Sequence, residues 1–255
     1  MITVSVVSLK GGVGKTSVVL GLAGAAQAAG LRALVVDLDP QANTSMILGS
    51  DQTDFTMNDV FADGGAGVMA DAIQESGWGP GVDVVPSELA LERRNTDTGD
   101  RLEYRLSRTM EGVRGYDLVL LDSPPALNSL AINGLTASDR ALVVTEPTVF
   151  SIVGAQKALD AVDVVRRNYN PRLRPAGVVI NKARRSAEHE FRIAELRQSY
   201  ADLVWLPAIP DRSVTFQAQG AFVPVQRWKS AAAEELRLVF ADFLDRLLSM
   251  APRRR

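Results

Sequence analysis

The chain has 255 residues, of which 46% are hydrophobic and 23% are charged, and its formal net charge is −2. This length favours one large α/β domain, and the absence of cysteine excludes disulfides, iron–sulfur clusters and thiolate zinc sites. No apolar run approaches the ~20 residues of a membrane-spanning helix, and the first residues lack the charged segment of a signal peptide. We therefore expect a cytoplasmic protein.

Charge is unevenly distributed along the chain. Residues 1–127 carry a net charge of −8, whereas residues 128–255 carry +6. A basic half predicts an electrostatic partner such as a nucleic acid. Ion pairing within the protein surface is the alternative explanation.

Short apolar runs alternate with segments of helical periodicity. The strand-like runs are Thr3–Ser8, Ala33–Val36, Val82–Val85, Leu118–Leu121, Ala141–Val144, Gly177–Ile180 and Val204–Leu206. The helical segments are Ser17–Ala29, Ser87–Asn95, Gly99–Val113, Asn128–Thr136, Ser151–Arg167, Ala187–Tyr200 and Ala232–Met250. Runs that are apolar throughout suit strands buried on both faces. The alternation predicts one α/β domain over residues 1–255, a mostly parallel twisted sheet with helices on both faces.

Two segments depart from this alternation. Residues 49–81 are rich in Gly, Asp and small side chains, which predicts an exposed, mobile surface insertion with one or two short helices. Residues 251–255 form a basic tail that ends in three arginines.

The first predicted strand is followed by eight residues with a phosphate-binding pattern, Lys10, Gly11, Gly12, Val13, Gly14, Lys15, Thr16 and Ser17. They fit the pattern G-x-x-x-x-G-K-[ST], except that Lys10 stands in place of the first glycine. The glycines let backbone N–H groups turn inward around phosphate oxygens. Lys15 supplies charge for the β- and γ-phosphates, and the Thr16 hydroxyl suits Mg²⁺. A helix that begins near Thr16 adds its positive end to this anion site.

Three aspartates lie at the ends of predicted strands. Asp37 and Asp39 follow the second strand at i and i+2, so their side chains point the same way on an extended segment. Asp122 follows four apolar residues, which is the Walker B arrangement for holding Mg²⁺. Aspartate at a strand end also forms turns, but a phosphate loop in the same sheet favours the magnesium role.

Together these motifs resemble the ParA/MinD family of deviant Walker A ATPases, in the SIMIBI class of P-loop NTPases, and most closely its ParA branch. The matching segments span nearly the whole chain: Lys10–Ser17, Asp37–Asn43, Val84–Leu91, Val119–Pro125, Val179–Lys182 and Ile209–Pro224.

The resemblance implies roles near the phosphates. Lys10 matches a lysine that reaches across a dimer interface to the partner's ATP, and Lys15 matches the phosphate-loop lysine. Asp39 matches the aspartate that positions the attacking water. These three residues are the expected catalytic residues. The expected magnesium ligands are Thr16, Asp37 and Asp122.

The resemblance also implies how the base is held. Asn181 matches an asparagine that contacts adenine, and Pro210–Gly220 matches a loop that closes over the base and brings Pro210 and Asp211 to the nucleotide.

Glu146 ends a predicted strand beside the expected site, and we interpret it as a loop residue.

For function, the resemblance implies a Mg²⁺-dependent ATP hydrolase that forms ATP-dependent sandwich dimers. Such dimers bind double-stranded DNA non-specifically and segregate or position plasmid or chromosomal DNA on the nucleoid, and a ParB-like partner stimulates their slow hydrolysis. Asp211 replaces the arginine that many relatives carry after the proline. The candidate DNA contacts are therefore Arg184, Arg185, Arg212 and Lys229.

Two alternatives remain open. The first is a MinD-like membrane switch, for which the last predicted helix has an apolar stripe. Its polar face, however, carries Glu235, Asp242 and Asp245, which an anionic membrane would repel, so packing of this helix into the core is favoured. The second is a ParA-like protein that positions a cargo other than DNA, which sequence does not separate from partition. Family members that carry iron–sulfur or arsenite chemistry use cysteines, which this chain lacks.

Overall fold

A computed structural model describes residues 1–49 and 55–251. In this part of the chain, eight strands form one sheet in the order β3-β4-β2-β5-β1-β6-β7-β8. The strands are β1 (Ile2–Val7), β2 (Ala33–Asp37), β3 (Gln74–Glu75), β4 (Val82–Val85), β5 (Leu118–Asp122), β6 (Arg140–Thr145), β7 (Arg174–Ile180) and β8 (Val204–Trp205). Only β3 at one edge is antiparallel to its neighbour. The expected mostly parallel α/β sheet is confirmed.

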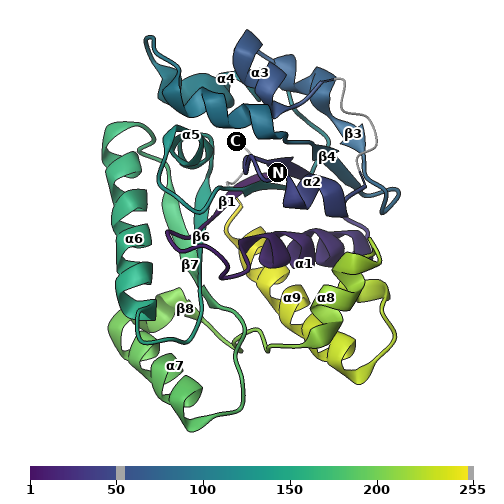
Figure 1. Cartoon of the computed structure of the whole chain (residues 1–255), viewed down its shortest axis with the longest axis vertical. Helices are drawn as coiled ribbons and strands as arrows, with labels where there is room; N and C mark the ends of the chain where they lie inside the picture. The colour runs from purple at the N-terminus through teal and green to yellow at the C-terminus, as the bar shows by residue number, and fades with distance from the viewer. Residues whose placement is uncertain (50–54, 252–255) are drawn as a thin grey trace.

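Helices cover both faces of this sheet (Figure 1). The α-helices are α1 (Lys15–Ala28), α2 (Asn43–Ile47), α3 (Met57–Asp63), α4 (Arg105–Thr109), α5 (Ser129–Thr136), α6 (Ser151–Asn168), α7 (Ala187–Tyr200), α8 (Ser213–Gly220) and α9 (Ala231–Ser249). The 3-10 helices are η1 (Val68–Ala72), η2 (Leu89–Thr96), η3 (Leu102–Tyr104), η4 (Ala201–Leu203) and η5 (Val225–Arg227). α1 and α9 pack on one face, whereas α3, α5 and α6 pack on the other.

The central strands are buried on both faces, as their continuous apolar composition predicts. In β2, Leu34 and Val36 join the core cluster that contains Val119 of β5. Their neighbours Ala33 and Val35 point the other way and join the cluster beneath α1 and α9. Alternation of side chains along a strand is what lets one apolar run build two cores.

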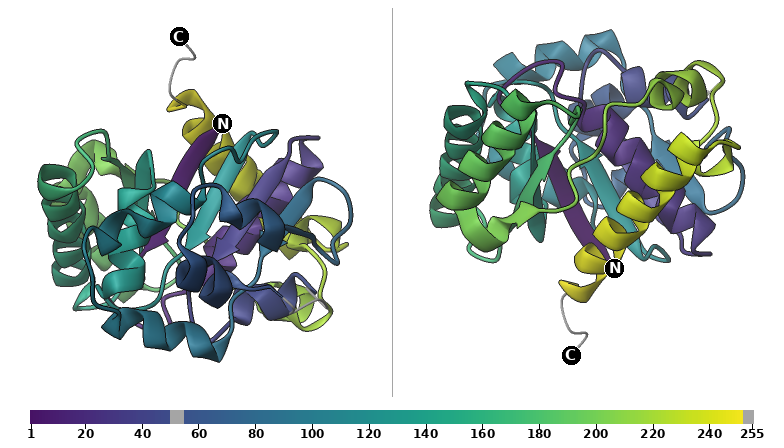
Figure 2. Two further views of the ribbon diagram at one scale, coloured as in Figure 1. Left: turned by 90° about the horizontal axis from the view of Figure 1, so that it is seen from above. Right: turned by 90° about the horizontal axis from the view of Figure 1, so that it is seen from below.

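α9 lies alongside α1 on one face of the sheet (Figure 2), and its apolar stripe joins the core cluster that contains residues of α1 and the sheet. Leu236, Val239, Phe240, Phe243 and Leu244 are all buried, which confirms the core-packed last helix. No helix within residues 1–49 and 55–251 is long and apolar enough to cross a membrane. The tail residues 252–255 lie outside the described residues.

Close contact between α1 and α9 depends on a glycine. A Cβ atom added at Gly21 of α1 would lie 2.2 Å from Cζ of Phe240. We expect Gly21→Ala to lower the free energy of unfolding by about 1–3 kcal/mol, because overpacking forces rigid neighbours apart. Urea unfolding followed by circular dichroism measures this change. Gly154→Ala in α6 is the control, because its Cβ would meet no atom within 4 Å; equal destabilisation by both variants would contradict the packing argument.

The expected exposure of residues 49–81 is wrong for several of its apolar residues, while the segment's mobility stays a prediction. Met57, Val60, Phe61 and Met69 are buried in the core beside β2 and β5, and Trp78 is buried in the core beneath α1. Short helices were expected in this segment, but its many glycine and aspartate residues favoured an exposed position. Residues 50–54 of the segment lie outside the described residues.

The long helix expected over Gly99–Val113 is also wrong. The structure has the short η3 and α4 instead, and Arg101 adopts a left-handed backbone with φ 56° that interrupts regular helix. The helix expected over Ser87–Asn95 is the 3-10 helix η2.

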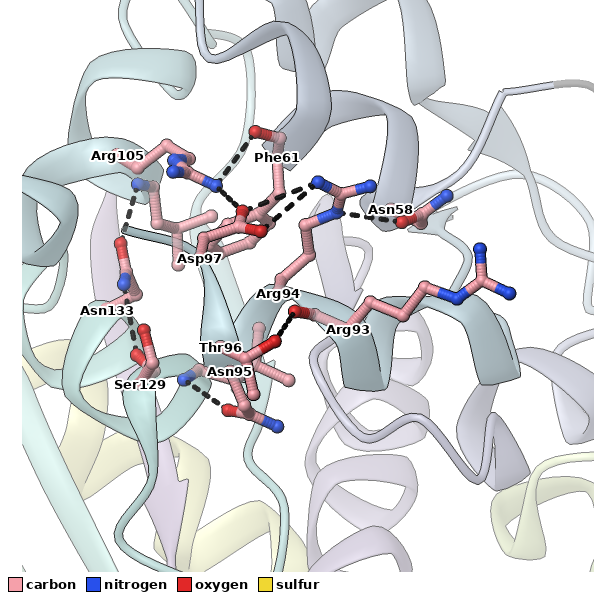
Figure 3. Close-up of polar contacts among 12 residues, drawn as sticks. Asn58, Phe61, Arg93, Arg94, Asn95, Thr96, Asp97, Arg105, Ser129 and Asn133 are labelled. Carbon is pink, nitrogen blue, oxygen red and sulfur yellow. Dashed lines mark hydrogen bonds and ion pairs between the residues drawn. The ribbon is translucent and has the colours of Figure 1, made fainter. Parts of the chain in front are cut away.

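Polar contacts, rather than long helices, hold these short elements together (Figure 3). Asp97 accepts a hydrogen bond from Arg105 at 2.6 Å and also contacts Arg94 at 3.4 Å. Arg94 in turn donates from Nε to Asn58 of α3 at 3.0 Å. The arginines hold the pKa of Asp97 below its ordinary value despite its partial desolvation. This network ties α3, η2 and α4 into one layer beside β4.

Candidate nucleotide and phosphate site

The phosphate loop lies between β1 and α1, and its backbone requires glycine. Gly12 and Gly14 have φ values of 78° and 89°, a region that disfavours residues with a Cβ atom. A Cβ at Gly14 would also lie 2.1 Å from Nδ2 of Asn181. That same nitrogen donates a hydrogen bond to the carbonyl of Val13 at 2.8 Å. The loop is therefore fixed from the far side by the residue that follows β7.

Lys15 begins α1 and is 7% exposed. Burial lowers the pKa of its ammonium group, and the nearby charges of Asp122 and Asp39 oppose that change. Its charge thus lies inside the site, close to the N–H groups of the first helical turn. A partly desolvated cation beside unpaired amides is suited to bind phosphate oxygens.

Asp122 ends β5 next to α1, as its position in the sequence predicts. Its Oδ2 accepts hydrogen bonds from Thr16 at 2.8 Å and from Thr44 of α2 at 2.5 Å. Its Oδ1 is buried and has no hydrogen-bond partner among the described residues. Burial raises the pKa of this carboxyl group, against the hydrogen bonds of Thr44 and Thr16. A buried carboxylate oxygen without a partner, beside a hydroxyl group, fits a hard divalent cation such as Mg²⁺.

Asp37 pairs in register with Asp122 on the neighbouring strand. Its Oδ2 accepts hydrogen bonds from the backbone and hydroxyl of Ser45 at 2.9 and 2.7 Å, and its Oδ1 accepts one from the backbone of Asp39 at 3.0 Å. Burial, with the charge of Asp122, raises the pKa of Asp37 to about 7. Asp37 therefore fixes the segment that carries Asp39, and its magnesium role stays a prediction.

Asp39 lies at the start of the turn after β2. Its Oδ1 accepts a hydrogen bond from the backbone of Gln41 at 3.0 Å, and its charge acts on Lys15. Asp39 and Lys15, two of the three predicted catalytic residues, are thus close enough for their charges to interact. The role of Asp39 toward water stays a prediction.

The residues expected at the base gather at one surface pocket. Asn181, Pro210 and Asp211 line it together with Ser17 of α1. The expected loop over Pro210–Gly220 is wrong in part, because residues from Ser213 onward form helix α8. Phe216 of α8 also lines this pocket with 61% of its surface exposed. An aromatic residue inside a predicted loop was the signal that could have identified it.

Lys10 lies at the outer rim of the phosphate loop with 52% of its side chain exposed. Its Nζ contacts Oε2 of Glu146 at 3.3 Å. Glu146 follows β6 and also pairs with Lys182 at 2.9 Å. Sequence reasoning gave neither Glu146 nor Lys182 a role, because nothing in their local pattern indicates that three strand ends bring them to Lys10.

Of the four candidate DNA contacts, Arg184 and Arg212 lie close together at Asp211. Arg184 pairs with Asp211 at 2.7 Å, and the adjacent Arg212 pairs with Glu235 of α9. Lys229 lies just before α9 and is exposed, as is Arg185. Within the described residues, neither Arg185 nor Lys229 forms an ion pair. The ion-pairing alternative therefore holds for two of the four positions.

Two features of this parallel sheet define the P-loop NTPase fold. A phosphate loop follows β1, and the buried carboxylate of Asp122 ends β5, which lies beside β1 in the sheet. Comparison with known proteins narrows this class. A family model described as an AAA domain matches residues 1–175. The chromosome partitioning protein ParA of Caulobacter vibrioides is 35% identical over 214 residues, which cover 81% of this chain and 79% of that protein.

Two solved structures share the fold. The ATP complex of McdA from Cyanothece has a TM-score of 0.84 at 20% identity and covers 100% of this chain and 99% of its own. Cobyrinic acid a,c-diamide synthase from Mycobacterium smegmatis, with a bound ATP analogue and magnesium, has a TM-score of 0.78 at 25% identity, with coverage of 96% and 93%. The chain belongs to the ParA/MinD family of P-loop ATPases. Within this family it resembles the ParA branch, which contains chromosome partitioning proteins.

Proposed function

We propose that the protein is a Mg²⁺-dependent ATPase that pairs in the presence of ATP, binds DNA without sequence preference and segregates or positions DNA. The observation that carries this proposal is the arrangement of Lys10, Lys15, Asp39 and Asp122 around one phosphate loop. Lys15 is buried inside the site, whereas Lys10 is exposed at its rim.

The nucleotide is held by residues from several parts of the chain that meet at the phosphate loop. Backbone N–H groups of the loop and the first turn of α1 bind phosphate oxygens, and Lys15 neutralises the β- and γ-phosphates. Thr16 and Asp122 would hold Mg²⁺, which supplies further positive charge when bound. Asn181 and Pro210 border the base. Asn181 thus supports the phosphate loop and the base pocket at once, since it donates to Val13.

Asp39 carries the hydrolytic step in this proposal. Phosphoryl transfer depends on positioning and charge neutralisation more than on covalent chemistry. Asp39 orients a water molecule in line with the γ-phosphate and accepts its proton. Carboxylates are weak bases because their ordinary pKa is about 4, so intrinsic turnover is slow. A slow ATPase suits a switch that a ParB-like partner accelerates.

Lys10 couples ATP to pairing. Its ammonium group lies outside its own phosphate loop, where a second protomer that faces the site presents a triphosphate. Two exchanged lysines then make ATP part of the interface, so the dimer forms with ATP and separates after hydrolysis. The similarity to a ParA chromosome partitioning protein supports this assignment.

DNA binding is proposed at the region of Arg184, Arg185, Arg212 and Lys229. Contacts to DNA phosphates need only exposed cations at a suitable spacing. Arg185 and Lys229 are exposed, so they remain available to DNA phosphates. Arg184 and Arg212 would each leave the carboxylate of their ion pair, Asp211 or Glu235, to bind a DNA phosphate.

The DNA assignment is tested with the double variant Arg185→Glu/Lys229→Glu. With ATP, its affinity for unrelated duplexes should fall by about ten-fold or more, and the slope of log affinity against log salt should fall by about 1 for each lost phosphate contact. Fluorescence anisotropy with two duplexes of different sequence measures both quantities. Arg114→Glu is the control, because this exposed arginine precedes β5 at the opposite end of the sheet. Equal loss in both variants would refute the assignment.

A further inference from the structure

Glu146 lies between two lysines that come from different strand ends. Lys10 follows β1 and Lys182 follows β7, and β6, which precedes Glu146, lies between those strands in the sheet. Oε1 of Glu146 contacts Nζ of Lys182 at 2.9 Å, and Oε2 contacts Nζ of Lys10 at 3.3 Å. The carboxylate itself is only 18% exposed. One carboxylate thus binds two ammonium groups, one with each oxygen.

The two lysines are held differently. Lys182 also donates a hydrogen bond to the carbonyl of Gly12 in the phosphate loop, and its side chain is 35% exposed. Lys10 is 52% exposed, and its side chain makes no other hydrogen bond or ion pair within the described part of the chain. Lys182 is therefore anchored at two points, whereas Lys10 depends on Glu146 alone.

This difference makes Lys10 exchangeable. A mostly buried carboxylate that loses its only partner is strongly destabilised. Glu146 keeps Lys182 when Lys10 departs, so that penalty does not arise. Only the exposed pair is lost, and such pairs contribute little to stability.

Two apolar side chains shortly after Glu146 in the sequence are exposed. Val149 and Phe150 follow Glu146 at the start of α6 and are exposed by 61% and 72%. Large adjoining apolar side chains in solvent are typical of surfaces that another molecule covers. Glu146, which holds Lys10, thus lies three and four residues before two apolar side chains that a second protomer could cover.

We propose that Glu146 is a positioning residue that holds Lys10 on its own chain and competes for it with the triphosphate of a second copy. The inference rests on the proposed ATP-dependent dimer and adds the group that opposes it. Each protomer must break the contact between Lys10 and Glu146 before its lysine reaches the partner's nucleotide. Glu146 thereby raises the protein concentration at which ATP-loaded chains pair.

The test is Glu146→Gln, which keeps the shape of the side chain and removes its charge. Each exposed ion pair is worth about 1.5- to 5-fold in an equilibrium constant, and two are broken per dimer. We therefore expect the dimer dissociation constant to fall by about 2- to 25-fold in sedimentation equilibrium with a non-hydrolysable ATP analogue. The affinity of the monomer for the analogue should not change. Glu188→Gln on α7, which removes a carboxylate from an exposed pair with Arg192, should leave the dimer constant unchanged.

A double variant separates positioning from a structural role. In a Lys10→Ala background there is no lysine to release, so Glu146→Gln should produce no tightening. A structural effect through Lys182 and the phosphate loop would change the dimer constant in both backgrounds. Tightening that persists without Lys10, or an unchanged or weaker dimer in the single variant, overturns the inference.

Amine labelling tests the contact without the dimer. In nucleotide-free protein, Glu146→Gln should raise the acylation rate of Lys10 relative to Lys157, an exposed lysine of α6, as measured by peptide mass spectrometry. An unchanged ratio shows that Lys10 is not held and also overturns the inference. A wild-type protein that stays monomeric with the analogue overturns the proposed dimer itself, and the labelling result then shows whether the contact nevertheless exists.

Discussion

Replacing Asp39 by alanine should abolish ATP hydrolysis and leave the ATP-bound dimer in place. Asp39 starts the turn after β2, where its carboxylate acts on the buried Lys15. Removal of a group that positions water and accepts its proton typically lowers a rate by about 100-fold or more. The groups proposed to bind the nucleotide and its Mg²⁺, Lys15, Thr16 and Asp122, are untouched, so binding should persist. The dimer therefore accumulates because the step that separates it is lost.

Two measurements check this result together. Phosphate release under single-turnover conditions reports hydrolysis, and gel filtration with MgATP reports the dimer. Asp202→Ala is the matched control, because Asp202 is an exposed aspartate of η4, which precedes β8 and is distant in sequence from the phosphate loop. An Asp39→Ala protein that elutes as a monomer with ATP would refute the assigned role. So would one that hydrolyses ATP at the wild-type rate.

Replacing Lys10 by alanine should have the opposite effect on the dimer. The side chain of Lys10 lies at the rim of the phosphate loop with its ammonium group on Glu146, so ATP affinity of the monomer should change by less than about three-fold. A hydrogen bond to a charged group contributes about 1.5–3 kcal/mol, and the dimer contains two such lysines. Their loss should raise the dimer dissociation constant by about 100-fold or more.

Equilibrium binding of a fluorescent ATP analogue and sedimentation equilibrium separate the two effects. Lys157→Ala controls for loss of a surface lysine, since Lys157 is exposed on α6. If Lys10→Ala instead weakens nucleotide binding and dimerisation in parallel, Lys10 serves its own nucleotide and the exchange across the interface is wrong.

The two variants also distinguish the family mechanism from a simple ATPase. A monomeric enzyme would lose activity with Asp39→Ala and show no change in association state. In the proposed switch, loss of Asp39 abolishes hydrolysis and keeps the dimer. Loss of Lys10 abolishes the dimer and keeps nucleotide binding by the monomer. Glu146→Gln then adds a third response, a tighter dimer with nucleotide affinity unchanged.

The sequence predicted the parallel sheet because each central strand is a continuous run of apolar residues. β2 and β5 are continuous apolar runs that end in aspartate, and such runs suit strands covered on both faces. The short edge strand β3 has only two residues, too few for any periodicity. α3 and η1 correspond to the one or two short helices expected in residues 49–81, but their buried residues Met57 and Met69 were expected in solvent.

The phosphate site was predicted in detail because it is a local motif. Gly12, Gly14, Lys15 and Thr16 are adjacent in the chain, and their chemistry follows from residue type and spacing. The acid Asp122 is distant in sequence, but its position at a strand end places it at the same edge of a parallel sheet. The sequence could not show that Oδ1 of Asp122 lacks a hydrogen-bond partner among the residues that the structure describes. Nor could it show that the hydroxyl of Ser45 donates a hydrogen bond to Asp37.

By itself the sequence determined the sheet, the phosphate loop and the carboxylates that face it, because each depends on residues close together or on strand ends that a parallel sheet must align. Only the tertiary structure decided which charged side chains form ion pairs with one another. Glu146 meets Lys10 and Lys182 across 136 and 36 positions of sequence, through three neighbouring strand ends. Long-range ion pairs leave no periodic signal in a sequence, because they depend on how the chain brings distant backbone segments within a few ångströms.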